Sequence, residues 1–165
     1  IGYLGIIESR LDFALLAEIL KRFPRATLLM GGPVWDKEAL ARLKRFPNFK
    51  AIGPIAYADL PELYRVFDVA IIPHRVTPFT QSMNPLKMYE YLACGLPVVT
   101  TPVAGTEQFS SFIKIAANHS EFLAAIKFYL ARPLTVAEQA ARRAVVQRKT
   151  WYNRLAEMFT YLSHD

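Results

Sequence analysis

Two charged side chains three residues apart, Lys87 and Glu90, have the types and spacing that best suit ligand chemistry. On a helix they share one face, about 4.5 Å apart along the axis. A lysine one turn from a helix N-terminus favours a phosphate, and a carboxylate further along can accept hydrogen bonds from both hydroxyls of a ribose. The same spacing also suits a surface ion pair worth a few tenths of a kcal/mol. Spacing alone leaves both interpretations open.

The helix that would carry this pair has local start and stop signals. Asn84 is predicted as its N-cap and Pro85 as its first residue. Gly95 can adopt the left-handed conformation that ends a helix, and Pro97 prevents continuation. The side chains expected to lie opposite the charged pair, and so to be buried, are Met88, Tyr89, Leu92 and Ala93.

The residues around Lys87 and Glu90 form a pattern that extends beyond the predicted helix. The stretch Pro85-x-Lys87-x-x-Glu90-x-x-Ala93-x-Gly95-x-Pro97-Val98-Val99 resembles the donor-site signature of the C-terminal domain of retaining GT-B glycosyltransferases, group 1 type. Residues 53–73 and 1–5 resemble earlier segments of the same domain. The resemblance therefore covers nearly the whole chain. It implies a single donor nucleotide-sugar-binding domain over residues 1–165, with the N-terminal acceptor domain absent from this chain.

The resemblance also implies roles for individual residues. Lys87, with Arg75 as a second cation, would stabilise the diphosphate leaving group, and Glu90 would bind the ribose. Two positions depart from the family pattern: Ser82 stands where a Glu is frequent, and Arg10 is the nearest cation after Gly5, where the family has a basic pair. The other predicted donor-binding residues are Gly5, Gly31, Asn84, Pro85 and Leu86, and the loop 53–58 would meet the nucleobase. Glycines also end strands routinely, so Gly5 and Gly31 have a purely structural alternative.

These residues need elements that bring them together. Apolar strands alternating with helices predict an α/β fold, a doubly wound parallel sheet of about six strands with helices on both faces. Such sheets bind ligands beyond the carboxyl ends of their strands. The expected strands are 1–7, 26–30, 49–52, 69–72, 97–100 and 112–116. The expected helices are 11–23, 36–44, 59–66, 85–94 and 120–131, followed by a helical tail, 136–165, with Thr150 as a candidate break; 73–83 is expected to be a loop.

Composition excludes several classes of protein. The 165 residues, 53% hydrophobic and 21% charged, suit one globular domain. A single cysteine, Cys94, excludes an intramolecular disulfide, and without an Asp-x-Asp motif we expect no bound metal. The net charge of +6 indicates anionic ligands only weakly, and no motif indicates nucleic acid. No apolar run is long enough to span a bilayer.

The functional expectation follows from the resemblance. The whole protein would transfer a sugar from a nucleotide diphosphate donor, of the uridine or guanosine type, to a glycan or lipid-linked acceptor in polysaccharide biosynthesis, whereas this chain alone would be inactive. The alternatives are a non-catalytic nucleotide-sugar or partner-binding domain and a sugar-nucleotide epimerase of the same architecture. We expect a cytoplasmic location. The basic tail would pack on the domain or, as the alternative, contact the inner face of the membrane.

Overall fold

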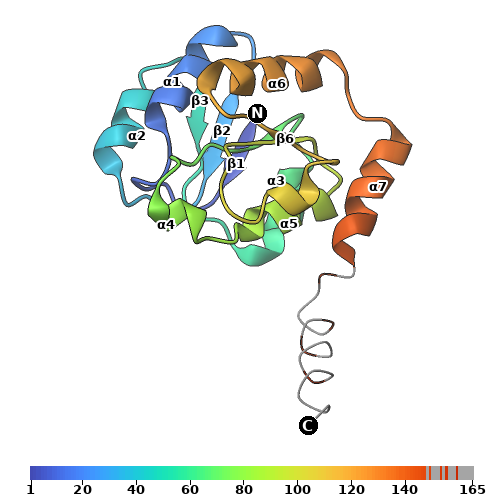
Figure 1. The fold of residues 1–165 in the computed structure, drawn as a ribbon. Coiled ribbons are helices and arrows are strands. Elements are labelled where there is room, and N and C mark those ends of the chain that lie inside the picture. The colour runs from blue at the N-terminus through green and yellow to red at the C-terminus, as the bar shows by residue number, and fades with distance from the viewer. Residues whose placement is uncertain (148, 150–152, 154, 156–158, 160–165) are drawn as a thin grey trace.

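The computed structural model describes residues 1–147, 149, 153, 155 and 159. These residues form a parallel sheet with the strand order β3-β2-β1-β4-β5-β6 (Figure 1). The order reverses direction between β1 and β4, as in a doubly wound fold. The fold class predicted from the sequence is therefore confirmed. The strands are β1 (Gly2–Leu4), β2 (Leu28–Gly31), β3 (Phe49–Ala51), β4 (Ala70–Ile72), β5 (Val98–Thr100) and β6 (Lys114–Ile115).

The helices follow the predicted order, with one addition. The loop expected over 73–83 contains the short helix α4, so that expectation is wrong. Thr77 forms a capping box with Thr80, and Pro78 occupies the first turn, so local signals do support a helix here. The helices are α1 (Phe13–Arg22), α2 (Lys37–Leu43), α3 (Leu60–Tyr64), α4 (Pro78–Gln81), α5 (Leu86–Ala93), α6 (His119–Ala131) and α7 (Val136–Gln147), with 3₁₀ turns at Tyr57–Asp59 and Glu107–Phe109.

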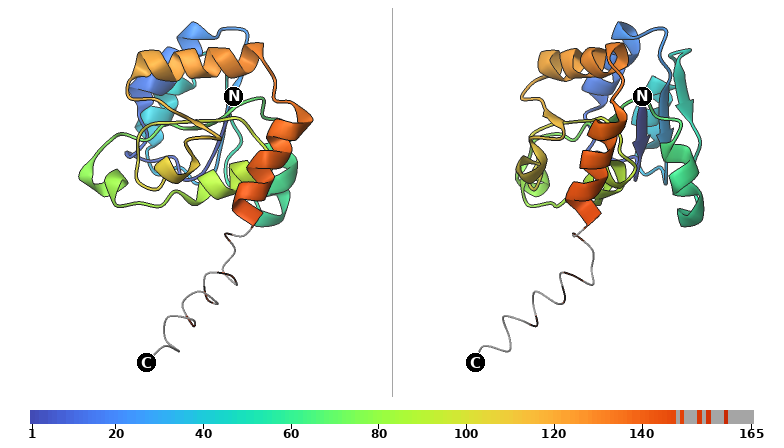
Figure 2. Two further views of the ribbon diagram at one scale, coloured as in Figure 1. Left: turned by 45° about the vertical axis from the view of Figure 1, so that its right-hand side comes forward. Right: turned by 90° about the vertical axis from the view of Figure 1, so that its right-hand side faces the viewer.

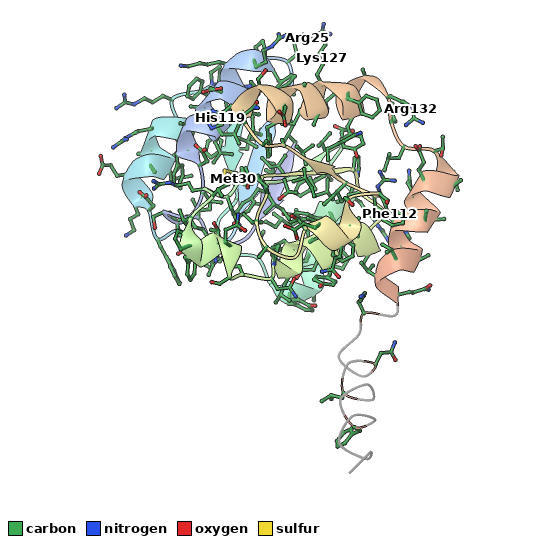
Figure 3. All side chains as sticks on the ribbon, viewed as in Figure 1. Arg25, Met30, Phe112, His119, Lys127 and Arg132 are labelled. Carbon is green, nitrogen blue, oxygen red and sulfur yellow. The ribbon has the colours of Figure 1, made fainter. Side chains whose placement is uncertain are left out.

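The sheet separates two hydrophobic cores because successive strand residues point to opposite faces. In β4, Ile71 packs into the core under α1, α2 and α6, whereas Ala70 and Ile72 pack under α3 and α5. Figure 1 shows these two groups of helices on opposite sides of the sheet. Met30 is fully buried and lies inside the domain in Figure 3, whereas the exposed Lys127 lies at its outer surface. The central strands β1, β4 and β5 are thus buried on both faces.

The loops after β1 and β2 approach each other closely at the carboxyl edge of the sheet. Gly32 has φ of +133°, and a Cβ there would lie 2.1 Å from the carbonyl oxygen of Gly5. Only glycine fits such a backbone contact. Ile7 then pairs with Val34 in a parallel bridge, so the two loops remain joined beyond the strands.

Helix α5 starts and packs somewhat differently from the sequence-based prediction. Asn84 is not the N-cap; Pro85 holds that position in an extended conformation, and the Asn84 side chain donates to the Tyr89 hydroxyl at 3.3 Å. Ala93 is exposed, and Tyr91 is fully buried in its place. The Tyr91 hydroxyl accepts a hydrogen bond from the backbone N–H of Leu4, in β1, at 3.0 Å. Gly95 has φ of +74°, which confirms its predicted role at the helix end.

Helix α7 packs against α5, and the views in Figure 2 show it beside the lower part of the domain. Arg142 and Val146 are buried, and Arg143 Nη2 donates to the Cys94 carbonyl at 3.4 Å. The first part of the tail, helix α7, is therefore docked on the domain. Several residues of the predicted tail lie outside the described residues: Arg148, Thr150, Trp151, Arg154, Met158 and Leu162. No helix among the described residues is long and apolar enough to cross a membrane.

The first prediction concerns the hydrogen bond between Tyr91 and Leu4. Tyr91→Phe leaves the buried Leu4 N–H without its acceptor, so the free energy of unfolding should fall by about 1–3 kcal/mol. Urea denaturation of the variant measures this loss. Tyr57→Phe is the matched control because Tyr57 is 80% exposed. Equal unfolding free energies for the two variants would contradict a structural role for the Tyr91 hydroxyl.

Candidate donor-binding site

A cavity of about 440 Å³ lies at the point where the strand order reverses, between the carboxyl ends of β1 and β4 and the start of α5. This is the edge at which doubly wound sheets bind ligands. The structure brings six of the predicted site residues together here. The lining residues are Tyr3, Gly5, Ile6, Arg10, Pro33, Ile72, His74, Met83, Asn84, Pro85, Leu86 and Lys87.

Arg10 brings a cation to the wall of this cavity. Its guanidinium pairs with Glu8 Oε1 at 2.6 Å, yet its buried Nε has no hydrogen-bond partner among the described residues. Beside it, burial raises the pKa of Tyr3 to about 12, with the Arg10 charge acting in the opposite direction. Tyr3 therefore stays protonated and donates to the Ile6 carbonyl at 3.1 Å. A ligand oxygen could satisfy the remaining Arg10 donor.

His74 contributes a neutral imidazole to the same cavity. The side chain is 5% exposed, and its Nδ1 has no hydrogen-bond partner among the described residues. Burial, and secondly the Arg10 charge, lowers the pKa of His74 to about 4. His74 is therefore uncharged near neutral pH and can donate or accept one hydrogen bond with a ligand.

Lys87 brings a second cation, and it reaches the cavity from the first turn of α5. Its Nζ lies 2.7 Å from Glu90 Oε2, so the ion pair expected from the spacing is present, with both side chains about three-quarters buried. The Tyr64 hydroxyl donates to the same Glu90 oxygen, and Lys87 Nζ lies 3.5 Å from that hydroxyl. Burial, and secondly the hydrogen bond to Glu90, raises the pKa of Tyr64. The three side chains form a connected polar cluster, of which Lys87 lines the cavity.

Four predicted residues do not line the cavity. Glu90 contacts the cavity only through its ion pair with Lys87. Arg75 is exposed, although its backbone N–H donates to the Arg10 carbonyl at 2.7 Å. A Cβ at Gly31 would lie 2.4 Å from Ile55 Cδ1, so a larger residue here would displace the Ile55 side chain. Ser82 Oγ donates to the Phe79 carbonyl at 2.8 Å and closes α4.

Tyr3 and Tyr64 were not predicted to belong to the site. Tyr3 could have been found, because in a strand it lies on the same face as Gly5, two residues later. Tyr64 carries no comparable signal, since it comes from α3 and meets Glu90, 26 residues later, only through the fold. Among the described residues, no group of three or more His, Cys, Asp or Glu side chains could hold a metal ion.

The fold and the cavity define a doubly wound domain with a cavity at its switch point. Residues 13–160 match the family model described as glycosyl transferase-like. The chain therefore belongs to this family. Together with the relative and the solved structures described next, the match confirms the resemblance to the C-terminal domain of a GT-B glycosyltransferase.

The chain is similar to part of a longer bacterial protein. It is 27% identical over 167 residues to TuaH of Bacillus subtilis (strain 168), which is named as a glycosyltransferase of teichuronic acid biosynthesis. The alignment covers 98% of this chain and 42% of TuaH. The chain thus spans less than half the length of this relative.

Solved structures show the same fold. A mutant of TarM from S. aureus, in complex with fondaparinux, alpha-GlcNAc-glycerol and UDP, matches with a TM-score of 0.77 at 16% identity over 99% of this chain and 35% of TarM. AviGT4, a glycosyltransferase of avilamycin A biosynthesis, matches with a TM-score of 0.68 at 19% identity over 98% of this chain and 50% of AviGT4. At these identities the likeness establishes the fold.

The second prediction tests the proximity of Arg10 and His74. Arg10→Gln should raise the pKa of His74 above about 4, because a neighbouring cation is lost, while burial should still hold it below the ordinary 6.5. Imidazole chemical shifts measured by NMR across a pH titration report this value. Arg75→Gln, which changes an exposed arginine of the adjacent loop, is the control. Identical His74 titrations in the two variants would contradict the arrangement.

Proposed function

We propose that this chain is the donor-binding half of a retaining glycosyltransferase that moves a sugar from a nucleoside diphosphate sugar to a glycan or lipid-linked acceptor. The observation that carries the proposal is the convergence of Arg10 and Lys87 on one cavity at the start of α5. Membership of the glycosyl transferase-like family supports it. UDP is present in the TarM complex, which favours a nucleotide-sugar as the ligand class here.

In this proposal the cavity stabilises the negative charge that grows on the diphosphate as it leaves. Lys87 adds a full positive charge beside the N–H groups of the first turn of α5, and Arg10 approaches from the loop after β1. Arg75 lies in the loop whose backbone contacts Arg10, and its exposed side chain would reach the diphosphate from the open side. Gly5 and the start of α5 (Asn84, Pro85 and Leu86) would provide close backbone approach.

The ribose would bind one step further along α5, at Glu90. Glu90 Oε2 already accepts hydrogen bonds from Lys87 and Tyr64. The carboxylate has further lone pairs that can accept hydrogen bonds from two ribose hydroxyls. Tyr64 would hold the carboxylate in place while Lys87 turns to phosphate. The base would meet the loop 53–58, and Ser82 would contribute to the sugar side of the site.

The remainder of the enzyme would lie outside this chain. TuaH is more than twice as long as the stretch it shares with this sequence. An N-terminal domain would complete the cleft and supply any general base, so the isolated chain would transfer no sugar. The relationship to TuaH favours a role in polysaccharide biosynthesis. We propose a cytoplasmic location, with contact between the basic tail and the inner face of the membrane as the alternative.

Calorimetric titration of the 165-residue chain with uridine, guanosine, adenosine and thymidine diphosphates tests the proposal. At least one should bind, and the corresponding sugar nucleotide should not be turned over. If none of the four binds, the donor-site assignment is wrong.

The third prediction concerns Lys87. Lys87→Ala should weaken nucleoside diphosphate binding by about 1.5–3 kcal/mol, the value of a charged hydrogen bond, and affect the free nucleoside far less. Added salt should reduce the difference. Lys21→Ala is the charge-matched control, because Lys21 is an exposed residue in the last turn of α1, the end remote from the carboxyl edge of the sheet. Equal losses for nucleoside and diphosphate would place Lys87 in a purely structural role.

The fourth prediction concerns Glu90. Glu90→Gln should weaken ribonucleotide binding by about 1.5–3 kcal/mol because two charge-assisted hydrogen bonds become neutral. A 2′-deoxynucleotide should lose less on the same substitution, since it has one ribose hydroxyl fewer. Calorimetry with both ligands on both proteins gives the comparison. An unchanged ribonucleotide affinity would leave Glu90 only as the ion-pair partner of Lys87.

A further inference from the structure

A second hollow, of about 420 Å³, lies at the carboxyl edge of the sheet beside the donor cavity. It is bounded by the segment after β1 and by the start of α2, and its lining residues are Glu8, Ser9, Trp35, Asp36, Lys37 and Glu38. The volume falls within the range of small-molecule sites, about 300–1,000 Å³. The hollow adjoins the donor cavity directly, because Glu8 of the hollow pairs with Arg10 of the cavity at 2.6 Å.

Trp35 supplies an aromatic surface in this hollow. The side chain is 67% exposed, although the Trp35 backbone N–H is held by the Ile7 carbonyl at 2.9 Å. The next N–H, that of Asp36, bonds to the same carbonyl at 3.1 Å. The ring therefore projects into solvent from a backbone that two hydrogen bonds hold in place, and a tryptophan has only two side-chain torsions to order on binding. An exposed aromatic face with polar side chains around it suits the C–H face of a sugar ring.

The polar groups of the hollow indicate a neutral sugar. Each of its acidic side chains already has a partner: Glu8 pairs with Arg10, Glu38 pairs with Arg42 at 2.5 Å, and Asp36 accepts the Ala39 N–H at 2.9 Å. Carboxylates in such pairs keep lone pairs that can accept from sugar hydroxyls, while Ser9 and Lys37 can donate. With their charges largely balanced, these groups favour hydroxyl-rich ligands over strongly acidic ones.

We infer that this hollow is a glycan subsite that holds neutral sugar units of the acceptor next to the donor cavity, with Trp35 as its stacking surface. The inference rests on the proposed function and refines it, because part of the acceptor then binds to the donor half. The sugar chain would run from the hollow past the Glu8–Arg10 pair toward the phosphate end of the donor.

Trp35 and Trp151 are the two tryptophans of the chain, so in a Trp151→Phe background Trp35 is the fluorescent reporter. Maltotetraose, cellotetraose and chitotetraose are titrated as neutral probes, and tetragalacturonic acid as the acidic probe. At least one neutral tetrasaccharide should change the Trp35 emission saturably, and the acidic probe should bind about tenfold more weakly or not at all. A lack of saturation by all three neutral probes, or tighter binding of the acidic one, would overturn the inference.

Ligand-observed NMR then locates the binding. Trp35→Ala should weaken binding of the neutral tetrasaccharide about tenfold, whereas Trp35→Tyr, which keeps an aromatic face, should retain most of it. Tyr57→Ala is the control, an exposed aromatic residue that does not line the hollow. An equal loss in Trp35→Ala and Tyr57→Ala would overturn the assignment. If Trp35 instead covers another domain of a longer protein, no tetrasaccharide binds.

Nucleotide binding separates failure of this inference from failure of the proposed function. Trp35→Ala should bind the nucleoside diphosphates as the parent chain does, because Trp35 does not line the donor cavity. Nucleotide binding without tetrasaccharide binding would overturn the glycan subsite alone. Tetrasaccharide binding without nucleotide binding would overturn the donor-site proposal, and with it the acceptor role of the hollow.

Discussion

The hydrogen bond from the Leu4 N–H to the Tyr91 hydroxyl connects the two elements from which the candidate donor site is built. Leu4 is the last residue of β1, directly before the segment that leads to Arg10, and Tyr91 lies one turn after Lys87 on α5. Both groups are buried, so the bond cannot be exchanged for water without cost. The relative position of the two cations of the cavity therefore depends on the packing of α5 under the end of β1.

The same cations are held by carboxylates before any ligand arrives. Arg10 pairs with Glu8, and Lys87 pairs with Glu90. These pairs reduce the cost of placing two positive groups around one cavity, and they keep long side chains from sampling other rotamers. An incoming diphosphate would share or replace these partners. The affinity of the site would then reflect an exchange of ion pairs, smaller than the full attraction between two cations and a free diphosphate.

The donor cavity and the hollow that contains Trp35 are supported by the same backbone segments. Gly32 allows the loop after β2 to touch the Gly5 carbonyl, and Ile7 receives the N–H groups of Trp35 and Asp36. A shift of the loop after β1 would therefore move Arg10 of the donor cavity and Trp35 of the hollow together. This shared support gives a physical route by which occupation of one hollow could influence the other.

The sequence by itself determined the features whose causes lie within a few residues of each other. Apolar strands alternating with amphipathic helices specified the doubly wound sheet. Asp36 specified the start of α2, and Gly95 specified the end of α5. The spacing of Lys87 and Glu90 placed both side chains on one face of α5, where they form an ion pair. The exact start of α5 was predicted wrongly, because Pro85 and not its neighbour Asn84 is the N-cap.

Only the tertiary structure decided which of the candidate residues meet. Arg10 reaches His74 and the start of α5 because β1 and β4 are neighbours in the sheet, whereas Arg75, one residue from His74, points its side chain to solvent. Tyr64 joins Glu90 because α3 and α5 pack on the same face. Such contacts join segments far apart in the chain, and strand order and burial, which no short stretch encodes, bring them together.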